Sequence, residues 1–366
     1  MGMRSTAMHA SRLSAVINSQ TAGHPTPVIA AGIPPLRGQG VREHRGDFRS
    51  RNDGLRAPSL HEPRRHAGMA AAVPLPSRVA DPRLYFVSSH SYADMCGHAT
   101  IGYIASLAAV CALPASFEQN GMSIETPAGI FHVNGAFEAG RLSAVVLRSL
   151  PYYVPAADVA VEREGVGTVS YDISCSGITY PLVDDDKVDL PFDIMHASRW
   201  CRTGMAIKEA INAAGGHPLV DSVLSYRAIK GGARHLVVLA DNKFARSPCG
   251  IGTSTRLTQP HGRGKLAKGP SYQAENILGV PFAAKILDLG QSKDGRHNPG
   301  GARHGPRQRV FGRLGRRRPD SHRFPGQLTE RAMKFDPSIV LNDWAIRRSP
   351  MSMNRSDSRL VQFSFE

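Results

Sequence analysis

Two five-residue stretches, CGHAT at residues 96–100 and CGIGT at residues 249–253, share the pattern CGxxT. They lie 153 residues apart, which is about the length of one domain. Each stretch follows a segment that is typical of a strand and a loop, and each precedes a segment that is typical of a helix. The repeat therefore predicts two cysteines at helix starts, one in each of two domain-sized parts of the chain.

The segments around the repeat are typical of an α/β protein from about residue 85 to residue 290. LYFVSS at 84–89 and HLVVLA at 235–240 predict short buried strands. The apolar stretch 99–113 and the segment 198–214 predict helices, the second of which ends at a glycine pair.

The cysteine pair points to a specific chemistry. The thiolate is the reactive form of cysteine, and a helix N-terminus lowers the pKa of a thiol. The free amides of a helix start also bind carboxylates. Two such starts that face each other would hold an amino-acid carboxylate and place Cys96 and Cys249 on opposite faces of the α-carbon. One sulfur would remove the α-proton and the other would deliver a proton, so the centre would invert without a cofactor or a metal.

A structural role is the alternative for these cysteines, because free cysteine is often a core residue at a tight turn. The matching spacing and context of the two CGxxT stretches favour the catalytic interpretation. Cys111, Cys175 and Cys201 have no such context and are expected to be structural. The five cysteines show neither disulfide nor zinc-ligand spacing, which favours a reducing, cytoplasmic location.

The net charge of +15 is concentrated in two segments. Residues 1–66 carry ten arginines and four acidic residues, and residues 291–331 carry eleven basic and three acidic residues. Neither segment has the recognition motif or aromatic platform of a nucleic-acid-binding domain, so no nucleic-acid partner is expected. Residues 28–66 and 291–327 have few apolar positions, and this composition predicts disorder. The chain has no run of 18 apolar residues, so no membrane span is expected.

Four motifs resemble those of the proline racemase family, which includes 4-hydroxyproline 2-epimerases. DMCGHAT at 94–100 and RSPCGIGTS at 246–254 resemble the family's two catalytic motifs. TAGHPT at 21–26 and EPRRHAGM at 62–69 resemble two upstream motifs. The likeness runs from about residue 16 to residue 290.

The resemblance implies an α/β (α+β) fold like that of diaminopimelate epimerase. In this fold, two similar halves each wrap a sheet around a central helix, and the active site lies between the halves. The resemblance implies one catalytic cysteine from each half, Cys96 and Cys249, no cofactor, and commonly a homodimer. Family dehydratases carry threonine at the second position, so Cys249 favours a racemase or epimerase. The implied substrate-binding residues are Gly97, His98, Gly250, Ile251, Gly252 and Thr253.

The expected organisation has five parts. They are a disordered N-terminus (1–15), a first half (16–130), a second half (131–290), a basic low-complexity segment (291–331) and a C-terminal segment (332–366).

The expected substrate is an imino acid, either 4-hydroxyproline or proline. Ala70, Ala93 and Leu239 stand where proline racemases tend to carry bulkier side chains, and this favours 4-hydroxyproline. Ala245 stands where the family usually carries an aspartate that pairs with the cationic ring nitrogen. Loss of a buried charge partner costs about 3–5 kcal/mol. An alternative is therefore a catalytically impaired or non-catalytic relative that binds an imino acid, an interpretation that the loss of family likeness after about residue 289 also favours.

Overall fold

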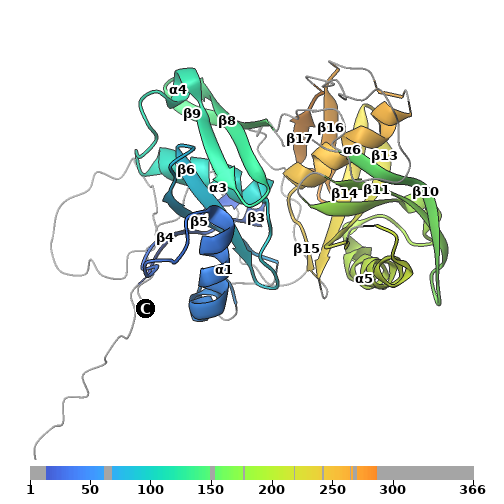
Figure 1. Cartoon of the computed structure of the whole chain (residues 1–366). Coiled ribbons are helices and arrows are strands. Elements are labelled where there is room, and N and C mark those ends of the chain that lie inside the picture. The colour runs from blue at the N-terminus through green and yellow to red at the C-terminus, as the bar shows by residue number, and fades with distance from the viewer. Residues whose placement is uncertain are drawn as a thin grey trace, which may run out of the picture.

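Two β-sheets, one in each half of the chain, form the framework of the protein (Figure 1). The computed structural model describes residues 14–61, 68–148, 153–175, 178–217, 219–240, 243–263, 265–266 and 270–286. The first sheet has the order β1 (Ala15–Ile17), β4 (Val28–Ala31), β5 (Ala70–Pro76), β6 (Pro82–Ser88), β7 (Met122–Thr126), β8 (Gly129–Glu138) and β9 (Arg141–Arg148). A separate two-stranded pair joins β2 (Gln20–Thr21) to β3 (His24–Pro25).

The second sheet contains the remaining strands. Its order is β10 (Tyr153–Arg163), β11 (Gly167–Cys175), β12 (Thr179–Asp184), β13 (Val223–Ile229), β14 (Gly232–Ala240), β16 (Tyr272–Asn276) and β17 (Pro281–Ala284), with β15 (Lys243–Phe244) paired to β14. The longer helices are α1 (Val41–Arg51), α3 (Gly97–Ala109), α5 (Ala197–Ala214) and α6 (Gly250–Gly262). The shorter ones are η1 (Asp53–Leu55), α2 (Arg56–Leu60), α4 (Phe117–Asn120), η2 (Asp185–Lys187) and η3 (Ile194–His196).

The two halves repeat one arrangement of elements. In the first half, β4 pairs parallel to β5, β5 antiparallel to β6, β6 parallel to β7 and β7 antiparallel to β8. The strands β12, β13, β14, β16 and β17 follow the same sequence of pairings in the second half. Helices α1 and α5 occupy one equivalent crossover, and α3 and α6 occupy the other. Equivalent elements begin 150 to 156 residues apart, so the CGxxT repeat is part of a repeated fold.

Three apolar clusters stabilise this arrangement. The largest contains Cys96, Cys249 and the buried faces of α3 and α6, together with strands of both sheets. A second cluster packs α5 on the second sheet, and a third packs α1 on the first. A fully buried aliphatic side chain such as Ile104 or Leu257 contributes about 1.5–3 kcal/mol. The cysteine helices are therefore held in the shared core, while α1 and α5 cover the outer faces (Figure 1).

Two expectations from the sequence need correction. The boundary expected between residues 130 and 131 falls inside β8, because β7, β8 and β9 pair successively and the first sheet continues to Arg148. Residues 28–61 are ordered rather than disordered, since they contain β4, α1, η1 and α2.

The apolar positions of residues 28–61 are few but well placed. The buried residues Val41, Phe48, Leu55 and Leu60 all face Tyr85, Val87 and their neighbours on the first sheet. A composition rich in arginine and glycine therefore still folds, because the few large apolar side chains share one face. The expected disorder of 1–13 and the expected segments after 286 lie outside the described residues.

No helix among the described residues has both the length and the apolar content that a membrane crossing requires.

Candidate active site

Cys96 and Cys249 each stand immediately before a helix, as the repeat predicts. The Cys96 carbonyl accepts hydrogen bonds from the amide and the hydroxyl of Thr100, at 3.0 and 2.9 Å. The Cys249 carbonyl accepts one from the amide of Thr253 at 2.7 Å, and the hydroxyl of Thr253 donates to the Pro248 carbonyl at 3.4 Å. The threonine of each CGxxT stretch thus closes the first turn of its helix, which accounts for its position in the motif.

The two helix starts contact each other through glycine. A Cβ atom added to Gly97 would lie 3.3 Å from the Gly250 Cα and 3.5 Å from the Ile251 nitrogen. A Cβ atom added to Gly250 would lie 3.5 Å from the Gly97 Cα. A side chain at residue 97 would press on backbone atoms of the facing helix, so the absence of one lets the two cysteine-bearing turns approach closely.

Both sulfurs are nearly enclosed and accept hydrogen bonds from their own helices. Cys96 and Cys249 are each 7% exposed. The amides of Ala99 and His98 point to the Cys96 sulfur. The amides of Gly252 and Ile251 point to the Cys249 sulfur, with 3.3 Å between the Gly252 nitrogen and Sγ.

The electrostatic environment separates the ionisations of the two sulfurs. Burial, together with the nearby Cys249, raises the pKa of Cys96 to about 12, although hydrogen bonds from the two amides act in the opposite direction. Burial also raises the pKa of Cys249, against hydrogen bonds from Tyr180 and the amides of Gly252 and Ile251. Two adjacent thiolates repel each other, so this arrangement favours one thiolate and one thiol over two thiolates. That is the protonation state that a one-base, one-acid proton transfer requires.

His98 contacts the first sulfur. Its Nδ1 and Nε2 lie 3.5 and 3.6 Å from the Cys96 Sγ. Burial lowers the pKa of His98 to about 4, so the imidazole is neutral at neutral pH. A neutral imidazole offers one donor and one acceptor nitrogen to the sulfur.

His24 connects the two halves beside this site. Its ring lies edge-on to His98, with 4.2 Å between ring centroids. Its Nδ1 accepts a hydrogen bond from the Arg246 amide at 3.0 Å, so Nε2 is the nitrogen that donates to the Gly68 carbonyl, at 2.9 Å. His24 occupies the position at which the TAGHPT motif departs from the family's TxGEPT.

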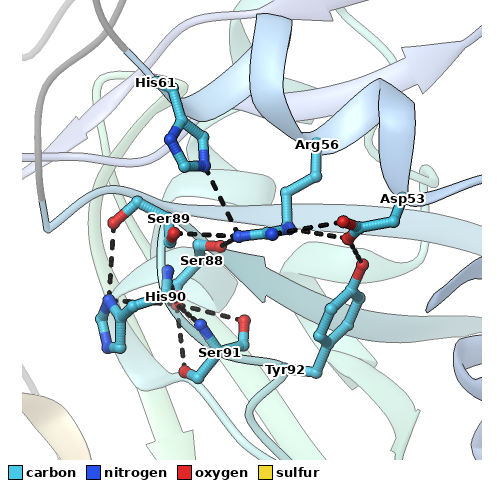
Figure 2. Close-up of polar contacts among 8 residues, drawn as sticks. All are labelled: Asp53, Arg56, His61, Ser88, Ser89, His90, Ser91 and Tyr92. Atoms are coloured by element: carbon cyan, nitrogen blue, oxygen red, sulfur yellow. Dashed lines mark hydrogen bonds and ion pairs between the residues drawn. The ribbon is translucent and has the colours of Figure 1, made fainter.

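A polar cluster around Arg56 holds the loop that leads to Cys96 (Figure 2). Nη1 of Arg56 donates to the carbonyls of Ser88 and Ser89, at 3.2 and 2.9 Å. Nε of Arg56 donates to Asp53 at 2.7 Å, and the hydroxyl of Tyr92 also donates to Asp53. Arg56 therefore ties the start of the loop, and Asp53 ties its middle, to the segment η1–α2.

A second arginine holds the end of the same loop. Arg45 on α1 pairs with Asp94 and donates to the Tyr92 carbonyl at 3.2 Å. Asp94 stands two residues before Cys96. The segment expected to be disordered thus positions the first cysteine, because charged side chains that bury little area can still bind loop carbonyls.

The second cysteine has its own supporting contacts. His235 is 1% exposed, and its Nδ1 lies 3.2 Å from the Pro248 carbonyl oxygen, directly before Cys249. Burial lowers the pKa of His235 to about 3. The amide of buried Asn276 donates to the Arg246 carbonyl. Tyr180 on β12 places its hydroxyl 3.5 Å from the Cys249 Sγ.

The expected binding residues fall into two groups. Gly97 and Gly250 lie at the contact between the helix starts, and His98 lies at the first sulfur. Ile251 and Thr253 are buried, and the amides of Ile251 and Gly252 point to Cys249.

Other expected positions bear on the substrate. Ala245 is buried in the shared core, and Ala70 and Leu239 also contact that core.

The backbone of Cys249 has a left-handed conformation, with a φ angle of 64°. Residues 62–67, which belong to the upstream motif EPRRHAGM, lie outside the described residues.

Sequence reasoning missed Tyr180, His235, Asn276, Arg45 and Arg56. Tyr180 and His235 lie in runs typical of buried strands, where a polar residue among apolar neighbours is the only available signal. Arg45 and Arg56 lie in the segment 28–66, whose composition predicted disorder, so no structural role was expected for them.

Comparisons with known proteins point to one family. The profile of the proline racemase family matches residues 16–297. A 4-hydroxyproline 2-epimerase of Streptosporangium roseum is 30% identical over 77% of this chain and 88% of its own. A proline racemase of Clostridioides difficile is 28% identical over 77% and 88% of the two chains. The crystal structure of a hydroxyproline epimerase from Agrobacterium vitis, with bound trans-4-hydroxy-L-proline, has a TM-score of 0.74 at 22% identity, over 84% of this chain and 91% of its own.

Proposed function

Because this chain belongs to the proline racemase family, we propose that it inverts the α-carbon of 4-hydroxyproline or proline, with Cys96 and Cys249 as the alternating base and acid. Membership confirms the expected family and the expected α/β fold, and it makes the chain an amino-acid racemase or epimerase. The two-cysteine mechanism and the choice of imino acid are the proposed parts.

One observation carries this proposal: the two cysteine-bearing helix starts meet at Gly97 and Gly250. The first amides of a helix have no partner within the helix. The amides of these two glycines are therefore suited to bind the substrate carboxylate at the junction. A carboxylate held there would set the α-carbon between the two sulfurs.

The chemistry then needs only the two thiols. One thiolate takes the α-proton, and the electron pair is left on the α-carbon next to the carboxylate. The opposite thiol delivers its proton to the other face, so the configuration inverts and the two sulfurs exchange protonation states. The enclosed site excludes water, which would otherwise exchange with the transferred proton.

The side chains near the site favour 4-hydroxyproline over proline. Ala70 and Ala93 present only methyl groups next to the shared core, and Leu239 is the one larger residue of the three. Smaller side chains leave room for a ring hydroxyl. We also expect a homodimer, which light scattering of the purified protein would measure.

A second candidate is a non-catalytic protein that binds an imino acid. Ala245 is buried and offers no carboxylate to the cationic ring nitrogen. An uncompensated cation in a closed site weakens binding or the transition state. Ligand binding by calorimetry, without any α-proton exchange, would favour this candidate.

Proton exchange in heavy water tests the proposal. The full chain is incubated with L-proline and, separately, with trans-4-hydroxy-L-proline, and NMR follows the loss of the α-proton signal. Cys96→Ser and Cys249→Ser should each abolish exchange. Cys111→Ser is the matched control because this cysteine is exposed and lies outside both CGxxT stretches. Exchange that survives either active-site variant would refute the two-thiol mechanism.

A further inference from the structure

The two sulfurs have different side-chain neighbours. The Cys96 Sγ lies beside the ring of His98, at 3.5 Å from Nδ1. The Cys249 Sγ lies 3.5 Å from the hydroxyl of Tyr180 on β12. Tyr180 is 3% exposed. The repeat of the fold therefore places the sulfurs alike but surrounds them with an imidazole on one side and a phenol on the other.

These neighbours offer different hydrogen bonds to the sulfurs. The buried phenol of Tyr180 keeps its proton, since burial raises its pKa well above the usual value. A protonated hydroxyl can donate to a thiolate, and a hydrogen bond to the charged form favours that form. The neutral imidazole of His98 has one donor and one acceptor nitrogen at similar distances from the Cys96 sulfur, so it can bind either a thiolate or a neutral thiol.

We propose that Cys249 is the first of the two thiols to ionise and the initial base of the resting protein, because the Tyr180 hydroxyl lies 3.5 Å from its sulfur and can donate a hydrogen bond to its thiolate. Cys96 then carries the proton that the opposite face receives. The proposal rests on the proposed function for the roles of the sulfurs. It implies that the resting protein first accepts the substrate enantiomer whose α-hydrogen faces Cys249.

Charged and titratable groups on neighbouring elements act on the sulfurs and on Tyr180. Cys96 at the start of α3 repels a second thiolate, and this limits ionisation to one sulfur at a time. Asp221, before β13, acts on Tyr180 and raises its pKa further, which keeps the hydroxyl protonated. Arg246, three residues before Cys249, has its own pKa lowered by burial.

Alkylation without substrate tests the order of ionisation. Brief pulses of iodoacetamide across a pH series are followed by peptide mass spectrometry, which reports Cys96 and Cys249 separately. The alkylation rates of Cys96 and Cys249 can be compared directly, because both residues are 7% exposed and so equally accessible to the reagent. We expect Cys249 to react with the lower apparent pKa. Tyr180→Phe should raise the apparent pKa of Cys249 by about 1 to 2 pH units.

Two further measurements make the result specific. Tyr171→Phe, which changes a buried tyrosine of the same half outside the site, should leave both profiles unchanged. The ultraviolet absorbance of thiolate should appear at lower pH in Cys96→Ser than in Cys249→Ser. Earlier alkylation of Cys96, or an unchanged Cys249 profile in Tyr180→Phe, would overturn the proposal. Neither measurement needs turnover, so a protein that fails the exchange assay can still confirm or refute the order of ionisation.

Discussion

Replacement of Gly97 by alanine tests whether the contact between the helix starts sets the geometry of the site. The new Cβ would lie 3.3 Å from the Gly250 Cα and 3.5 Å from Cδ1 of Leu147. Carbon atoms pack best at about 3.5–4.0 Å, so the two helix starts must separate by about 0.2–0.7 Å. A misplacement of about 1 Å can cost about 100-fold in rate. The exchange rate should therefore fall about 3- to 25-fold.

The free energy of unfolding of the same variant should fall by about 0–2 kcal/mol. Overpacking costs about 1–3 kcal/mol, whereas alanine is favoured over glycine in a helix by up to about 1 kcal/mol. Thermal unfolding and α-proton exchange together separate these effects. In Gly250→Ala the new Cβ makes ordinary contacts of 3.5 Å or more, so the rate should change less than about twofold. Gly46→Ala, where a Cβ meets nothing within 4 Å, reports helix propensity alone.

The reasoning fails if Gly97→Ala exchanges protons as fast as the unchanged protein, or if Gly250→Ala is the slower of the two. Either result would mean that the helix starts can shift without moving the sulfurs relative to the substrate.

Three other perturbations test the surroundings of the site. Arg56→Lys should lower the free energy of unfolding by about 1–3 kcal/mol in urea titrations, because lysine cannot reach the loop carbonyls with a planar fork. Arg51→Lys, at an exposed position, should leave it nearly unchanged, and equal losses in the two variants would contradict a special role for Arg56. Tyr85→Phe should leave that free energy unchanged or raise it by up to about 1–2 kcal/mol, since its buried hydroxyl has no partner among the described residues; a clear loss would reveal a missed hydrogen bond. The free energy of unfolding should also fall as the pH drops from 6.5 toward 4. Burial lowers the pKa of His98 to about 4 and that of His235 to about 3. Over this pH range the two histidines therefore bind protons in the unfolded chain but not in the folded chain, which favours unfolding. His235→Gln should reduce this slope by up to about 1.4 kcal/mol per pH unit, and an unchanged slope would show that His235 is not buried in its neutral form.

The parts of the site that are local in sequence could be predicted. The CGxxT pattern alone predicts the position of each cysteine at a helix start, because its cysteine, glycine and threonine all act within one helix turn. The helices observed at Gly97–Ala109 and Ala197–Ala214 differ from the predicted ones by a few residues at their ends. The strand over Gly232–Ala240 includes the predicted run 235–240. Apolar runs and glycine ends are local features, so they can be recognised without the fold.

The missed parts depend on long-range contacts. Arg56 acts on carbonyls 32 and 33 residues away, and Tyr180 meets Cys249 across 69 residues. Nothing in the neighbouring sequence of these residues indicates such partners. The disorder expected for residues 28–66 was wrong over residues 28–61 for the same reason, because the few apolar residues of that segment find their partners on β6.

The enclosed position of the sulfurs also bears on the role of Ala245. Burial raises the pKa of both thiols, so thiolate is costly in the resting site. An imino acid carries a cationic nitrogen next to its α-carbon, and a nearby cation favours a thiolate. A carboxylate at residue 245 would compete with the thiolate for that cation, whereas alanine leaves the nitrogen without this partner. The substitution therefore has two opposing effects, since it weakens the binding of the cation but increases the help that the bound cation gives to ionisation of the thiol. The balance between these effects decides whether the chain is a slow epimerase or only a binding protein.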